Sequence, residues 1–143
     1  MAYSTDIEAA KALAWEMHAG QVDKAGLPYI THPQRVAERL ESPEAKVVGW
    51  LHDTVEDTAL TVGDIEARFG PETAAAVDAV SRREGEDWSD YLGRVEANPV
   101  ARQVKISDLI DNSNLTRIPH VTLRDVERQA RYNRALKELL EGP

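Results

Sequence analysis

Signals that start and stop helices recur along this chain and constrain its fold more than any other feature. Ser42-Pro43 and Asn98-Pro99 each place a helix-capping side chain before a proline that suits the first helical position. Gly70-Pro71 ends one helical segment and starts another. Strand signals are weak throughout, so the sequence predicts an all-α fold, a single compact helical domain of about seven or eight helices.

The helices are expected between these signals. Thr5 with Glu8, and Thr122 with Asp125, have the spacing of a capping box, which satisfies free backbone groups at a helix start. The polar stretches 20–33 and 82–90 are predicted to be loops, the second of them mobile. The expected helices run from 5 to about 20, from 33 to 40, from 43 through the segment 50–58, from 61 to 69, from 71 to about 81, from near 88, from 99, and from 122 to about 140, the last with an apolar stripe of Leu123, Val126, Leu136, Leu139 and Leu140.

The composition is that of a globular protein and excludes several other classes. The 143 residues suit one domain, residues 1–143, with enough apolar residues for a core. A net charge of −8 argues against a nucleic acid as the main partner, and no apolar run approaches the roughly 20 residues of a membrane span. The acidic start MAYSTDIEAA differs from a signal peptide and Cys is absent, so we expect a cytoplasmic protein without disulfides, with a homo-oligomer left open.

The segment WLHDTVEDT, residues 50–58, gathers one His and three carboxylates beside apolar residues. Charged side chains are rarely buried unless they are paired or bind a metal. On a continuous helix His52 and Glu56 share one face and Asp53 and Asp57 another, so His52 and Asp53 would meet one ion only at a helix edge that faces a cleft. The alternative is a solvated acidic helix face that carries a single histidine.

Two further segments carry residues of the same chemistry. In YITHP, Pro33 biases His32 away from helical dihedral angles and fixes it at a helix entrance. In VKISDLIDN, Asp108 lies in an apolar stretch and needs a partner, and Lys105 and Asn112 fall on its face of the helix. The alternatives are an N-terminal cap histidine and an exposed Lys–Asp ion pair of little energetic weight.

Taken together, His32, His52, Asp53 and Asp108 form a set of two imidazoles and two carboxylates. Such mixed ligands suit Mn, Fe, Co, Ni or Zn better than Ca or Mg, and they leave room for water in an octahedral site. A bound metal lowers the pKa of its water, so that the resulting hydroxide can attack phosphorus. The set therefore predicts a site that hydrolyses a phosphate ester or anhydride.

A His, a later His-Asp pair and a distant Asp form the signature of HD-domain metal-dependent phosphohydrolases, which this sequence resembles. The segments HAGQVDKAGLPYITHPQRVA, WLHDTVEDT, IEARFG and VKISDLIDN, within roughly residues 10–116, are similar to the hydrolase domain of the RelA/SpoT homologues. The resemblance implies a small stand-alone hydrolase that uses Mn²⁺ to remove the 3′-pyrophosphate from guanosine tetra- or pentaphosphate, the (p)ppGpp alarmones of the stringent response.

The same resemblance implies roles for individual residues. The metal-ligand positions are matched by His32, His52, Asp53 and Asp108. Glu56 and Asp57 match a catalytic pair that orients or activates water, with a surface role as the alternative. Lys24 and Asn112 match positions that contact the substrate, and Lys105 is expected to contact it as a cation near the metal.

One position departs from the family pattern. The alarmone hydrolases carry an Arg that can lie against the guanine base where this chain has Asp23, which cannot stack on a purine and repels phosphate. Recognition of guanine is therefore open. His18 matches a motif position for which we expect a core role, and Arg35, Arg82 and Arg83 are further cations that could line the site.

Two other functions stay open, and Asp23 favours the first of them. One is an HD phosphohydrolase for another nucleotide or phosphorylated metabolite, such as a nucleotidase or an NADPH phosphatase. The other is a non-catalytic nucleotide-binding module that keeps the fold. The complete ligand set and the Glu56-Asp57 pair favour an enzyme over the binding module.

Overall fold

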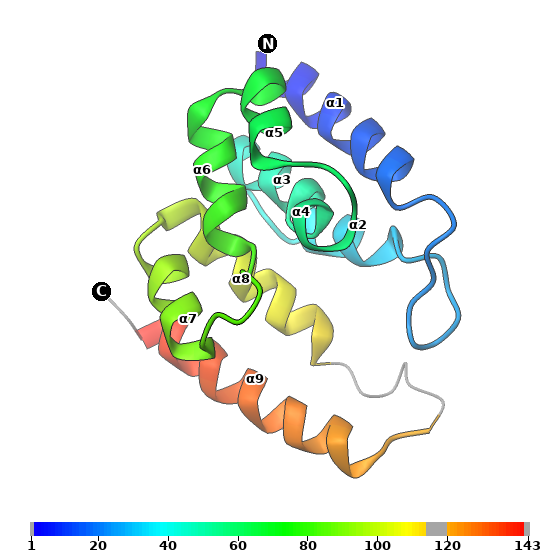
Figure 1. The fold of residues 1–143 in the computed structure, drawn as a ribbon, viewed down its shortest axis with the longest axis vertical. Coiled ribbons are helices and arrows are strands. Elements are labelled where there is room, and N and C mark those ends of the chain that lie inside the picture. Colours follow the sequence, from blue (N-terminus) through cyan, green and yellow to red (C-terminus); the bar gives the residue numbers. More distant parts are fainter. Residues whose placement is uncertain (1, 114–119, 142–143) are drawn as a thin grey trace.

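The computed structural model describes residues 2–113 and 120–141, and these residues form an all-α fold, as predicted (Figure 1). Within the described ranges the β pairing is limited to an isolated bridge between Val22 and Pro28. None of the described helices is long and apolar enough to cross a membrane. The helices are α1 (Ala2–Met17), α2 (Thr31–Glu38), α3 (Pro43–Leu51), α4 (Thr54–Asp57), α5 (Val62–Phe69), α6 (Pro71–Val80), α7 (Trp88–Glu96), α8 (Pro99–Asn112) and α9 (Leu123–Glu141).

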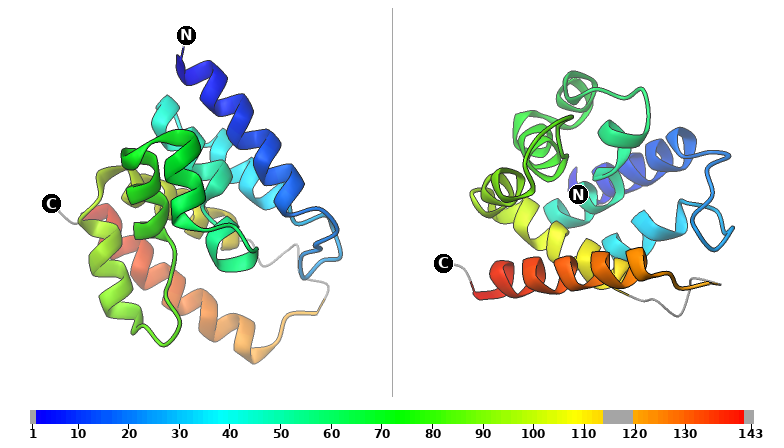
Figure 2. Two further views of the ribbon diagram at one scale, coloured as in Figure 1. Left: turned by 45° about the horizontal axis from the view of Figure 1, so that its top comes forward. Right: turned by 60° about the horizontal axis from the view of Figure 1, so that its bottom comes forward.

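Helix α3 is the central element. Ala45 and the residues from Val47 to Leu51 are buried on all sides, as expected for a helix that is apolar almost all round. It packs against α1, α2, α6 and α8, and Figures 1 and 2 show it enclosed by them. Helices α2, α3 and α8 therefore meet inside the molecule.

Gly49 allows α2 and α3 to approach closely. A Cβ at this position would lie 3.0 Å from the Cα of Ala37 and 3.0 Å from Cδ1 of Leu40, so a larger residue would push the two helices apart. Ser107 joins α8 to the same pair, because its hydroxyl donates to the carbonyl oxygen of Val36 at 2.9 Å. These contacts fix the spacing between the helices that carry the candidate ligands.

The capped helix starts are confirmed, with one exception. Ser42 accepts a hydrogen bond from the backbone of α3, Thr61 forms a capping box with Asp64, and Asn98 and Thr122 cap α8 and α9. The predicted start at Thr5 is wrong, because α1 already begins at Ala2. No proline or glycine precedes Thr5 to stop the helix there.

The segment 50–58 does not form the continuous helix that the sequence predicted. Helix α3 ends at Leu51 and α4 begins at Thr54, which adds one helix to the predicted seven or eight within the described residues. The hydroxyl of Thr54 donates to the carbonyl oxygen of Leu51 at 2.7 Å, and Asp53 takes φ −101° and ψ −1°. This break directs Asp53 to the same point as His52, which a continuous helix would allow only at a helix edge.

The prediction that Pro33 keeps His32 outside the helix is also wrong. Helix α2 begins at Thr31, so His32 lies in its first turn and Pro33 follows it there. Proline is tolerated at this point because backbone N–H groups in the first turn have no partner within the helix. The imidazole is still held at the start of α2.

The apolar stripe predicted along α9 is wrong over much of its length. Leu123, Val126 and Leu140 are 74%, 49% and 63% exposed, whereas Leu139 is buried and Leu136 packs against it as part of a second core cluster with α7 and α8. Only the C-terminal half of α9 reaches this core. Arg128 and Arg131 of the same helix line a cleft instead.

Candidate metal centre

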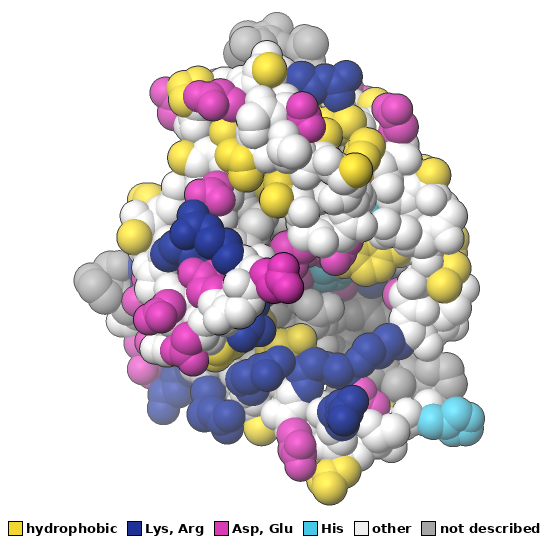
Figure 3. Space-filling view, in the orientation of Figure 1, with side chains coloured by type: hydrophobic (Ala, Val, Ile, Leu, Met, Phe, Trp, Pro, Cys, Tyr) yellow, Lys and Arg dark blue, Asp and Glu magenta, His cyan; other side chains and the backbone are white. Residues whose placement is uncertain are grey.

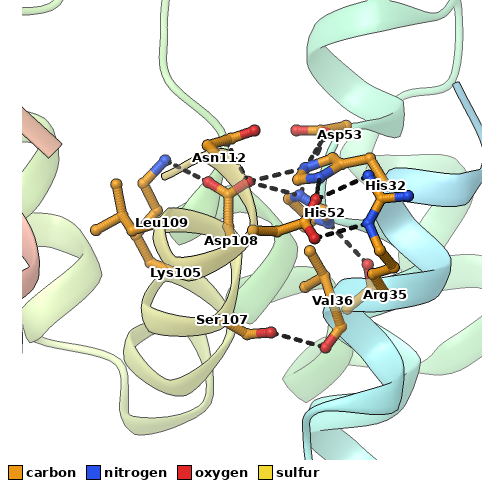
Figure 4. Close-up of polar contacts among 12 residues, drawn as sticks. His32, Arg35, Val36, His52, Asp53, Lys105, Ser107, Asp108, Leu109 and Asn112 are labelled. Atoms are coloured by element: carbon orange, nitrogen blue, oxygen red, sulfur yellow. Dashed lines mark hydrogen bonds and ion pairs between the residues drawn. The ribbon is translucent and has the colours of Figure 1, made fainter. Parts of the chain in front are cut away.

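Four side chains from three parts of the chain converge at one point (Figure 4), and His32, Asp53 and Asp108 among them line a cleft. Nε2 of His32 lies 2.9 Å from an oxygen of Asp108 and 3.5 Å from an oxygen of Asp53. Nε2 of His52 lies 3.2 Å from the same Asp53 oxygen and 3.4 Å from the same Asp108 oxygen. The structure thus brings together all four residues that the sequence proposed as ligands.

The two imidazoles are oriented by hydrogen bonds at their other nitrogen. Nδ1 of His52 donates to the carbonyl oxygen of Gly49 at 2.7 Å, and Nδ1 of His32 pairs with the carboxylate of Asp111 at 2.7 Å. Nε2 of His52 is buried and has no hydrogen-bond partner among the described residues, although two carboxylate oxygens lie within 3.4 Å. A histidine held at Nδ1 in this way presents the Nε2 lone pair to a metal ion.

Asp111 is a site residue that the sequence analysis missed. Its carboxylate is 1% exposed and accepts hydrogen bonds from Arg35 at 2.7 and 3.1 Å and from Arg39 at 3.1 Å, besides its pairing with His32. Its position one turn after Asp108 was the available signal. Arg35, considered from the sequence as a cation near the site, holds this carboxylate in place.

The residues present fit a divalent transition-metal ion. Ligand atoms of His32, His52 and Asp53 all lie within 4.8 Å of one another, and Asp108 adjoins both imidazoles. Bonds of about 2.1 Å at right angles place neighbouring ligand atoms about 3 Å apart, close to the separations seen here. The unpartnered nitrogen of His52 supports the same conclusion, since a buried polar atom without a partner is costly.

Charges within the site oppose the effect of burial on the ligands. Burial would lower the pKa of His32, but hydrogen bonds to Asp108 and Asp111 raise that pKa to about 9. The pKa of His52 is likewise raised, since the adjacent carboxylates outweigh burial. Burial would raise the pKa of Asp53, but the His52 charge holds it below the usual range. A metal ion would therefore displace protons from the imidazoles.

Glu56 and Asp57 lie on the cleft wall beside the four ligands. The Glu56 carboxylate accepts a hydrogen bond from the backbone N–H of Arg82, so the segment between α6 and α7 holds it in place. Burial raises the pKa of both carboxyl groups, and the nearby Asp53 charge raises them further. Carboxylates with raised pKa values are suited to proton transfer near neutral pH.

The three predicted substrate contacts lie in two different parts of the cleft. Nζ of Lys105 lies 2.8 Å from Asp108, and the amide of Asn112 donates to the same carboxylate at 3.0 Å. Burial would lower the pKa of Lys105, but the charge of Asp108 raises it above its usual value. Lys24 lines the cleft farther out and lies 3.5 Å from the Asp125 carboxylate at the start of α9.

Asp23 is bound to its own loop. One of its carboxylate oxygens accepts hydrogen bonds from the backbone N–H groups of Ala25 and Leu27, both at 2.9 Å. The carboxylate therefore stabilises the turn. Asp23 has this structural role at the position where the alarmone hydrolases carry an Arg. Tyr29 donates its hydroxyl to Asp53 and is thus part of the site.

His18 is buried next to the same tyrosine. Its ring centroid lies 5.1 Å from that of Tyr29, and its Nδ1 lies 2.8 Å from the side-chain oxygen of Gln21. Gln21 in turn donates to the backbone oxygen of Asp57 at 3.2 Å. His18 therefore supports the site from the core, as the sequence analysis expected.

The cleft measures roughly 530 Å³, and its far wall was missed by sequence reasoning. Trp88 of α7 and Arg128, Arg131 and Tyr132 of α9 line it. Figure 3 shows Lys and Arg side chains in a row along one edge of the hollow, with Asp and Glu side chains across from them. Neither a motif nor a periodicity marks these residues, because only the docking of α9 brings them to the site.

Comparison with models of protein families shows to which family this chain belongs. The model of the HD domain matches residues 10–103, which include three of the four candidate ligands. The chain belongs to the HD-domain family. The matched residues of this HD domain contain the His52-Asp53 pair.

Curated relatives of this HD domain are longer proteins. It is 32% identical over 77% of its length to a guanosine-3′,5′-bis(diphosphate) 3′-pyrophosphohydrolase of Aquifex aeolicus, covering 18% of that protein. It is 47% identical over 48% of its length to a probable enzyme of the same name from Synechocystis sp., covering 10% of it. A GTP pyrophosphokinase of Streptomyces coelicolor is 31% identical over 94% of the chain, which covers 16% of that protein. The chain thus spans less than a fifth of these relatives.

A solved structure shares the fold of this HD domain. It is described as a metazoan ortholog of SpoT that hydrolyzes ppGpp, and it superposes with a TM-score of 0.80 at 20% sequence identity. The match covers 96% of this chain and 86% of the other. At this identity the likeness establishes the helical fold.

Proposed function

We propose that residues 1–143 form a single metal-dependent phosphohydrolase domain. The observation that carries this proposal is the convergence of two oriented imidazole Nε2 atoms with the carboxylates of Asp53 and Asp108 at the end of a cleft. His32, His52, Asp53 and Asp108 would hold the ion, with Mn²⁺ as the proposed metal. When bound, the ion would supply positive charge to the phosphoryl group and lower the pKa of water.

The chain's own residues account for the remaining steps. Glu56 and Asp57, with raised pKa values, would accept the proton of the attacking water and return one to the leaving group. The backbone N–H of Arg82 holds Glu56 for this role. Lys105 and Asn112 would bind phosphate oxygens next to Asp108, and Lys24 would bind the substrate nearer to the mouth of the cleft.

The proposed substrate is the 3′-pyrophosphate of a guanosine 3′,5′-bis(diphosphate)-like alarmone. The Aquifex aeolicus and Synechocystis relatives are named for this activity, and the metazoan protein with the same fold is described as hydrolyzing ppGpp, which supports this choice. The bond that breaks joins the ribose 3′-oxygen to phosphorus, so the products are inorganic pyrophosphate and the nucleoside 5′-diphosphate.

Asp23 favours a second candidate, a phosphohydrolase for another nucleotide or for a phosphorylated metabolite such as NADPH. With its carboxylate bound to the loop backbone, residue 23 offers no guanidinium to a guanine base. The chemistry at the metal centre would be the same, and the base would be weakly discriminated.

An assay of Mn²⁺-loaded protein against a substrate panel tests both candidates. The panel contains guanosine 3′,5′-bis(diphosphate), its adenosine counterpart and NADPH, with pyrophosphate and orthophosphate measured as products. We expect pyrophosphate release from the bis(diphosphates), lost in EDTA and in Glu56→Gln. Orthophosphate release from NADPH alone would favour the second candidate, and no turnover by metal-replete protein would favour the non-catalytic binding module.

A further inference from the structure

A second group of cations borders the cleft around the indole ring of Trp88. The guanidinium carbon of Arg82 lies 5.4 Å from the ring centroid, and that of Arg131 lies 5.0 Å from it. Nζ of Lys105 lies 5.6 Å from the same centroid. All four side chains line the cleft, so one aromatic ring gathers three positive charges from separate parts of the chain.

The two arginines differ from the other cations of the cleft in what balances their charge. Lys105 is paired with Asp108, and Arg128 with Asp125. Arg82 donates to the backbone oxygen of Glu86 at 3.3 and 3.0 Å, and Arg131 lies over the rings of Trp88 and Tyr132. Within residues 2–113 and 120–141 neither guanidinium has an ion pair with a carboxylate.

This placement is unexpected for the composition of the chain. Asp and Glu number 25 against 17 Lys and Arg, so carboxylates outnumber cations in the chain as a whole. Stacking on an aromatic ring fixes the position of a guanidinium without using its N–H donors, so Arg131 and the Nη1 group of Arg82, which does not bind Glu86, can donate to an anion. The arrangement is typical of a site that binds phosphate oxygens.

Lys105 connects the cations around Trp88 to the metal centre. Its ammonium nitrogen contacts Asp108 on one side at 2.8 Å and lies over the Trp88 ring on the other. A single nucleotide can therefore reach both the metal centre and the arginines around Trp88. Figure 3 shows the basic edge and the acidic wall facing each other across the hollow.

We propose that Arg82 and Arg131, positioned by Trp88, form a second anion-binding subsite for a phosphate or diphosphate group other than the one that is hydrolysed. The proposal rests on the proposed function and narrows it to substrates with two separated phosphate groups. Trp88 acts as a positioning residue, because guanidinium groups already lie against its ring.

Binding of inorganic pyrophosphate to the metal-free protein tests the subsite without turnover. Calorimetric titration in EDTA would compare wild type with Arg82→Gln, Arg131→Gln and a matched control, Arg134→Gln, which is an exposed arginine of α9 outside the cleft. We expect each cleft variant to bind about tenfold more weakly, the scale for one lost charged hydrogen bond. The control should stay within about twofold, as expected for a distant surface charge.

Trp88→Leu and Trp88→Phe test the positioning role. The leucine variant should weaken pyrophosphate binding although both arginines remain, and the phenylalanine variant should restore part of it because a ring is present. Equal affinity in wild type and both arginine variants, or an equal loss in Arg134→Gln, would overturn the subsite. Since no metal or turnover is involved, a protein that fails to hydrolyse nucleotides yet shows this pattern would contradict only the proposed function.

Discussion

The two ends of the cleft are built in different ways. At the metal centre, His32, His52, Asp108 and Asp111 are at most 8% exposed in their side chains, and helices packed in the main core fix them. At the other end, the exposed side chains of Arg82 and Arg131 lie over the ring of Trp88, which packs against a smaller core cluster. Changes at the second end cost less stability, so substrate preference can vary while the chemistry is kept.

The largest expected effect is at Glu56. Glu56→Gln keeps the shape of the side chain and should leave metal binding unchanged, but it removes a proton acceptor and should lower turnover by about 10²-fold or more. Steady-state kinetics with measured metal content checks this. The comparison variant is Asp57→Asn, and unchanged rates in both would mean that the pair has a structural role.

The next largest effect is expected at Asp111, which touches His32 but not the ion. Asp111→Asn should weaken metal affinity by about 10- to 100-fold, since such partners orient the ligand and raise its basicity. Competition with a chelating dye measures this. An affinity equal to that of wild type would show that the Asp111–His32 pairing does not support the metal site.

The same pairing gives the metal-free protein a pH dependence. The pKa of His32 is about 9 in the folded state and ordinarily about 6.5, so its stabilisation is complete below pH 6.5 and is lost as the pH rises to 9. Unfolding by urea in EDTA should show a loss of about 1–3 kcal/mol between these pH values. Asp111→Asn should show a smaller loss, and an identical loss in both proteins would contradict the assignment.

The smallest effect is expected in the recognition loop. Asp23→Arg adds a guanidinium that can stack on a base, but it also removes the acceptor for two backbone N–H groups. We therefore expect only a severalfold gain in kcat/KM for the guanosine over the adenosine bis(diphosphate). The control Asp23→Asn, which keeps an acceptor oxygen, should leave that ratio unchanged. A strong guanosine preference in wild type that Asp23→Arg does not alter would mean that another residue binds the base.

The sequence predicted the residues at the candidate metal centre because their residue types and local spacing indicate their chemistry. His52-Asp53 and the isolated carboxylate Asp108 stand out in apolar surroundings, and capping signals located most helix starts. The helix break at His52-Asp53 was missed, because no Pro or Gly marks it in residues 50–58. The role of the four residues as ligands stays a prediction.

The far wall could not be predicted, for a physical reason. Arg131 and Trp88 are 43 residues apart in sequence and meet only after α7 and α9 have packed on α8. Asp111 looks like any other helical carboxylate until α2 brings His32 and Arg35 to it. Interactions of this kind depend on tertiary packing and leave no local pattern.

The most direct test of the account is the metal stoichiometry of the purified protein. Protein treated with EDTA and then titrated with Mn²⁺ should bind one equivalent, and Asp108→Ala should bind none with measurable affinity, because metal binding needs the complete ligand set. Thermal unfolding should show the ion raising the Tm of wild type but not of the variant. Wild-type protein that retains less than about a tenth of an equivalent, with no change in Tm on adding Mn²⁺, Zn²⁺ or Co²⁺, would contradict the metal centre.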